Sequence, residues 1–145
     1  MTCSRPLRGD GGSALMLVPA GVLVLIMLGA IAIDSTIVAL AQRELSNRTA
    51  AVANDVAGAT ADDEAFYRSG EVTLDQHAAE RRLATSFSPA APAPFTAWGG
   101  RATTAGRSVT VEAWGDISYL FLKALPGFPD TTRVRATSTA TARGG

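Results

Sequence analysis

The chain has 145 residues, with 13 basic and 13 acidic side chains and a formal net charge of zero. This length allows one modest domain, and the balanced charge gives no electrostatic reason to expect nucleic acid as a partner. The only cysteine is Cys3, which excludes a disulfide bond within the chain.

An uncharged, mainly apolar run of 23 residues covers positions 11–33, and Arg5 and Arg8 precede it. A helix of this length measures about 35 Å, which is enough to cross a hydrocarbon core of about 30 Å with some tilt. The preceding arginines place the N-terminus in the cytoplasm and the rest of the chain outside. The sequence therefore predicts a single-pass protein of the cytoplasmic (inner) membrane, with the lipid bilayer as a partner.

A cleaved signal peptide is the alternative interpretation of this run, because Ala30-Ile31-Ala32 has the small-x-small pattern of a cleavage site. The apolar part of a signal peptide spans only about 7 to 15 residues, however, and this run is longer. The apolar pattern also continues through Ile37 and Val38 without a proline or glycine. We therefore favour a membrane anchor and expect the N-terminus to be retained.

The segment after Asp34 carries apolar side chains at steps of three and four residues, which is the period of one helix face. We call this face the packing stripe; it consists of Val38, Ala41, Leu45, Thr49, Val52 and Val56. No proline interrupts the segment, so we expect one rod over residues 13–61, after a cytoplasmic leader at 1–12. The packing stripe predicts a contact with a partner helix. We favour the interpretation that Asp34 is an ordinary acidic residue at the interface where the helix leaves the lipid. The alternative is that Asp34 is an inter-subunit charge, because a carboxylate at that depth is costly unless it is paired.

Residues 62–145 are expected to form a small extracytoplasmic region, so that the whole chain is α+β. Thr73 and Gln76 have the capping-box spacing that begins a helix. The segments VTVEAW and TTRVRATSTATA alternate as half-buried strands do, the second with Val134 and Ala136 inward and its arginines outward. Between them, ISYLFLKAL is either a short apolar helix or a buried strand.

We expect an antiparallel sheet of two or three strands with one or two helices, and this is too small to be stable without the long helix or a partner. Aromatic side chains are expected to supply its core. They are Phe95, Trp98, Trp114, Tyr119, Phe121 and Phe128.

Residue patterns typical of catalysis are weak. His77 is the only histidine, which argues against a histidine-based metal site or a catalytic triad. The acidic run Asp62-Asp63-Glu64 lacks the alternating oxygen ligands and the glycine of a calcium loop. We therefore predict no enzymatic activity, no metal and no cofactor.

Together these features resemble the TadE/TadG-like proteins of tight-adherence (Flp-type) pilus assembly. The matching elements are Gly12-Ser13-Ala14, Pro19, Asp34 and Arg43-Glu44-Leu45-Ser46-Asn47, followed by an alanine-rich helix and a strand–helix–strand ending. The processed TadE type has a Glu five residues after its processing glycine. Here that position is Leu17 after Gly12 or Ala14 after Gly9, so the chain is closer to the unprocessed TadG type.

The resemblance implies a membrane-anchored, pilin-like component of a bacterial Tad-type pilus or secretion system, with other pilus-assembly membrane proteins, or further copies of this chain, as partners. The alternative is a membrane-tethered binding module whose anchor is inert. An uninterrupted packing stripe beyond the membrane favours the first interpretation, because a simple tether would not need it.

Overall fold

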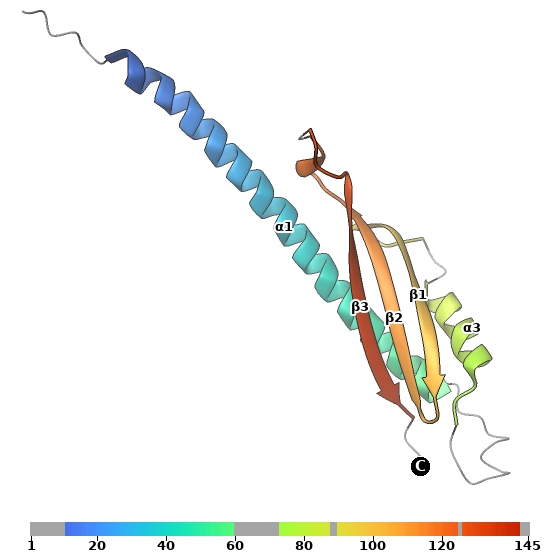
Figure 1. The fold of residues 1–145 in the computed structure, drawn as a ribbon. Helices are drawn as coiled ribbons and strands as arrows, with labels where there is room; N and C mark the ends of the chain where they lie inside the picture. The colour runs from blue at the N-terminus through green and yellow to red at the C-terminus, as the bar shows by residue number, and fades with distance from the viewer. Residues whose placement is uncertain (1–10, 60–72, 88–89, 125, 143–145) are drawn as a thin grey trace, which may run out of the picture.

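The computed structural model describes residues 11–59, 73–87, 90–124 and 126–142. It is an α+β protein, as the sequence predicts, in which a very long helix packs along one face of a small antiparallel sheet (Figure 1). The elements in chain order are α1 (Gly11–Ala59), α3 (Gln76–Phe87), β1 (Phe95–Ala105), β2 (Ser108–Ser118), the short 3-10 helix η1 (Leu122–Ala124) and β3 (Thr131–Thr141).

Helix α1 is one continuous element of 49 residues, which corresponds to about 74 Å. Pro19 lies near its start, where a missing backbone donor is tolerated. Ser46 and Thr49, which are poor helix formers, donate their hydroxyls to the carbonyls of Gln42 and Leu45 at 2.9 and 2.6 Å. These bonds satisfy both hydroxyls inside the helix, and the helix continues past them without a break.

The three strands pair antiparallel in the order β1-β2-β3. A two-residue turn joins β1 to β2, and Gly106 adopts a φ of 57° there, which suits a residue without a Cβ atom. In β2 and β3 the side chains alternate as predicted: Val134 and Ala136 are buried, whereas Arg133 and Arg135 are exposed. The sheet therefore has one buried face and one face that no described helix covers.

Both helices cover the same face of the sheet. Small aliphatic side chains from α1, α3 and all three strands form the core there, among them Val56, Leu83, Ala102, Val111 and Ala140. An ion pair between Asp55 of α1 and Arg82 of α3, with nitrogen–oxygen distances of 2.8 and 3.2 Å, also holds the helices together. The long helix thus supplies the second layer that the sheet needs.

The expectation of an aromatic core is wrong for most of the six residues. Phe95 is buried, but Trp98 is only half-buried, in contact with Phe87 and with the guanidinium of Arg48. Trp114 lies on the opposite face of the sheet, Tyr119 is partly exposed, and Phe121 and Phe128 are exposed. Aromatic content alone does not separate core residues from residues at the surface.

Strand β1 was not predicted, because FTAWGGRATTA contains two adjacent glycines and no strong alternation. Its glycines allow close packing across the sheet. A Cβ atom on Gly99 would lie 2.9 Å from the indole of Trp114, and one on Gly100 would lie 3.0 Å from the carbonyl oxygen of Glu112. The glycines that weaken the sequence pattern are therefore required where the neighbouring strand approaches.

Two local expectations are refined by the structure. Helix α3 begins at Gln76, and its cap is Asp75, whose carboxylate accepts the backbone N–H of His77 at 2.9 Å, rather than Thr73. The segment ISYLFLKAL is neither a regular helix nor a buried strand. It completes β2 at Ser118, and the described residues after it bend into the three-residue helix η1.

Candidate functional site

The N-terminal half of α1 projects beyond the sheet (Figure 1). From Leu17 to Ile33 its side chains are exposed, except that Ala30 is half-buried. Large apolar side chains cover it on all sides; they are Leu17, Val18, Val22, Leu23, Val24, Leu25, Ile26, Met27, Leu28, Ile31 and Ile33. Among the described residues, α1 is the one helix that is long enough and apolar enough to cross a membrane. An apolar surface of this extent is typical of a contact with lipid or with another protein.

Asp34 is the first charged residue after this surface, and it is buried, with 1 % of its surface exposed. Its carboxylate accepts backbone N–H groups from the connection between β2 and β3. Oδ1 lies 2.8 Å from the nitrogen of Leu120, Oδ2 lies 2.7 Å from that of Leu122, and both oxygens lie within 3.3 Å of the nitrogen of Phe121. Three consecutive donors thus surround one carboxylate, which is a strong arrangement for an anion.

We call this connection the β2–β3 loop, meaning residues 119–124 and 126–130. Because its hydrogen bonds go to this loop, Asp34, the candidate inter-subunit charge, has its bonding partners within its own chain. The contact joins the point where α1 leaves the sheet to the loop at the end of the sheet nearest the projecting half of α1 (Figure 1). Asp34 consequently has a structural role in holding the loop against the helix.

The packing stripe is also placed within the chain. Ala41, Leu45, Val52 and Val56 are buried, and Val38 is half-buried beside them. Their contacts include sheet residues, so the face that the sequence assigns to a partner helix is covered by the sheet of the same chain. In this fold the largest apolar helix surface that remains exposed for a contact with another protein is that of the projecting residues 17–33.

The position of Asp34 follows the same spacing. It precedes Val38 by four residues, so it lies one turn further along the packing stripe. This relation, which is visible in the sequence, could have indicated that Asp34 faces the chain's own domain. The identity of the three donors could not be predicted, because they are 86 to 88 residues away and contribute only backbone atoms.

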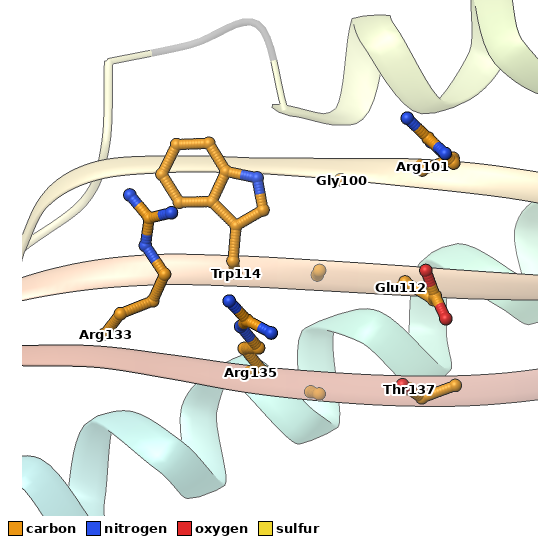
Figure 2. Close-up of a pocket in the computed structure, with 9 residues that line it drawn as sticks. Gly100, Arg101, Glu112, Trp114, Arg133, Arg135 and Thr137 are labelled. Atoms are coloured by element: carbon orange, nitrogen blue, oxygen red, sulfur yellow. The ribbon is translucent and has the colours of Figure 1, made fainter.

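A hollow of about 470 Å³ lies on the uncovered face of the sheet. Figure 2 shows Trp114, Arg133 and Arg135 projecting from this face, with Arg101 and Glu112 further along it and α1 behind the sheet. The hollow combines one aromatic ring with charges of both signs, which suits a polar ligand rather than an apolar one.

Arg133 is not free to bind a ligand in this hollow. Its guanidinium lies 4.5 Å from the ring centre of Trp114 and forms two bonds to Asp116, at 2.7 and 2.9 Å. The hydrogen bond from Arg133 holds the pKa of the Asp116 carboxyl below its ordinary value. Arg101 and Arg135 are exposed on the same face and remain the more accessible cations of the hollow.

The weaker candidates, which are His77 and the acidic run, do not form a catalytic or metal-binding site among the described residues. His77 is exposed on α3 and lies 4.0 Å from Glu80. The acidic run Asp62-Asp63-Glu64 lies outside the described residues. Across the part of the chain that the structure describes, no group of histidine, cysteine and acidic side chains could hold a metal ion.

Comparisons with known proteins identify no relative: no family model, no curated protein and no solved structure matches this chain.

Proposed function

We propose that this chain is a membrane-anchored, pilin-like subunit of a Tad-type pilus or secretion assembly. Its N-terminus would lie in the cytoplasm and its α+β domain outside the cytoplasmic membrane. The observation that carries the proposal is the double use of α1, whose first half is exposed and apolar while its second half is part of the domain core.

This arrangement differs from that of a domain on a flexible tether. No break separates the projecting half of α1 from the half that packs on the sheet, since the helix runs without interruption from Gly11 to Ala59. Leu45 and Val56 are fully buried against the domain, so the orientation of the projecting half is fixed by the core. A rigid subunit can transmit contacts made in the membrane to the domain outside it, whereas a flexible tether cannot.

The burial of the packing stripe bears on where the proposed assembly contacts would lie. Because the sheet occupies the packing stripe, the proposal assigns subunit contacts to residues 17–33. Helices in lipid associate through van der Waals packing and not through the hydrophobic effect, so the order of large and small side chains in this segment decides which partners fit.

The proposal is tested by replacing residues 17–33 with a leucine–alanine segment of the same length in the full chain. Membrane insertion and the unfolding of the domain should be unchanged, because the large side chains of this segment are exposed and none of them belongs to the buried core. Co-purification with other pilus-assembly membrane proteins should be lost. Leu40→Ala is the matched control, because Leu40 is exposed on the same helix outside the replaced segment.

Normal co-purification by the replaced chain would contradict the proposal and favour the tethered binding module. The hollow beside Trp114 is the specific observation in favour of that second function. Its accessible Arg101 and Arg135 would suit an anionic or strongly polar envelope ligand, and Arg135→Ala would weaken binding in that case without altering assembly.

A further inference from the structure

The domain has a second apolar surface besides α1, and it is confined to one short segment. Leu120, Phe121 and Phe128 are 52 %, 42 % and 55 % exposed. Among the described residues outside α1 they are the only large aliphatic or phenylalanine side chains that are exposed. All three belong to the β2–β3 loop.

We infer that the β2–β3 loop is a second membrane contact, seated in the outer interface of the bilayer that α1 crosses. The inference deepens the proposed function and rests on its claim that α1 is a membrane anchor. Its occupant is the boundary between lipid headgroups and acyl chains, where exposed apolar side chains can be buried to a depth of about 5–10 Å.

The position of the loop along α1 supports this inference. The uncharged run ends at Ile33, and its 23 residues span about 35 Å against a hydrocarbon core of about 30 Å. The outer boundary of the core therefore falls within about one turn of Asp34. Asp34 is hydrogen-bonded directly to the backbone of residues 120–122. The loop is therefore held at the same position along the membrane normal as this boundary.

The chemistry of the loop suits an interface. Burying irregular backbone near lipid is costly when its N–H groups have no partner. Here the N–H groups of Leu120, Phe121 and Leu122 are bonded to Asp34, and that of Ala124 is bonded to the carbonyl of Phe121 at 3.0 Å. Lys123, exposed in the middle of the loop, is placed to meet anionic headgroups.

Lipid is favoured over a protein partner because the apolar surface of the loop lies at the same depth along the membrane normal as the end of the apolar surface of α1. A bilayer that covers Ile31 and Ile33 reaches the loop without an additional binding partner. The result would be a domain supported at two points, so that its tilt relative to the membrane is restricted.

The test measures the depth of single labels in the full chain, reconstituted in phosphatidylethanolamine–phosphatidylglycerol vesicles. In a Cys3→Ser background, the environment-sensitive fluorophore NBD is attached at Phe128→Cys, at Val24→Cys or at Ala105→Cys. Val24 reports on the span, whereas Ala105 is exposed at the opposite end of the sheet, about 33 Å from the loop by strand rise. Quenchers are lipids that carry a doxyl group near the headgroup or deep in the acyl chain.

The inference expects the label at 128 to lose fluorescence with the shallow quencher, the label at 24 to lose it with the deep quencher, and the label at 105 to be unaffected. Quenching at 24 without quenching at 128 would overturn the inference and leave the membrane anchor intact. A blue shift at 128 without quenching would also overturn it, because a second protein copy would then cover the loop. Absence of quenching at both 24 and 128 would overturn the proposed membrane anchoring itself.

Discussion

Truncating Leu45 tests whether the packing stripe stabilises the fold of a single chain or contributes only to a contact with another protein. Leu45 is 0 % exposed and belongs to a cluster with Phe95, Ile117 and Val134. Large-to-small substitutions at such sites cost about 2–5 kcal/mol, so Leu45→Ala should lower the free energy of unfolding by about 3 kcal/mol. Leu40→Ala is the same chemical change on the same helix at a side chain that is 59 % exposed, and it should cost less than about 0.5 kcal/mol.

The measurement is urea unfolding of the purified full chain in detergent, followed by tryptophan fluorescence. The two tryptophans, Trp98 and Trp114, both lie in the sheet and therefore report on the domain. With a slope of about 2 kcal/mol per molar, the midpoint of Leu45→Ala should fall by about 1.5 M. Equal midpoints for the two variants would refute the reasoning, because the packing stripe would then contribute nothing within a single chain.

Four further outcomes are expected. A reporter fused at the C-terminus should be active only outside the cytoplasm, because basic residues precede the apolar run. Mass spectrometry should recover peptides from residues 1–10 in the mature protein, since the apolar run exceeds the length of a signal peptide. Asp116→Asn should make the free energy of unfolding less dependent on pH in the acid range. The pKa of Asp116 in the folded state lies below the ordinary 3.8, so its ion pair with Arg133 stabilises the fold above that pH. This stabilisation is lost as the pH falls through the pKa of the folded state. Gly115→Ala should destabilise the domain by about 1–3 kcal/mol in the same urea assay, because a Cβ atom there would lie 2.5 Å from the ring of Phe95.

Periodicity predicted the parts of the fold in which one face of an element is buried. Helix α1, and the inward residues Val109 and Val111 of β2, follow directly from the spacing of apolar residues. Periodicity states that a face is buried but not what covers it. The packing stripe therefore gave the correct face of α1, whereas its partner turned out to be the sheet of the same chain.

The features that the sequence did not predict are those that depend on distant backbone. Strand β1 is held by pairing with β2 and by the tolerance of its glycines for a neighbouring ring, and neither leaves an alternating pattern. The bonds of Asp34 likewise depend on a loop whose residues are apolar and whose backbone provides the donors. Apolar residues such as Phe121 and Phe128 look like core residues until their position outside the sheet is known.

The relation between Asp34 and the packing stripe explains how one helix can serve two environments. From Val56 back to Val38 every residue of the stripe except Thr49 is apolar, because the stripe packs on the sheet. At Asp34 the stripe becomes acidic, because it meets backbone N–H groups at the end of the sheet. Before Asp34 the large side chains of residues 17–33 are exposed, so they are available to lipid or to other proteins. The rotation of α1 about its own axis is nevertheless fixed relative to the sheet by the stripe and by Asp34. A partner that selects one side of the span would therefore also determine the direction in which the hollow beside Trp114 faces.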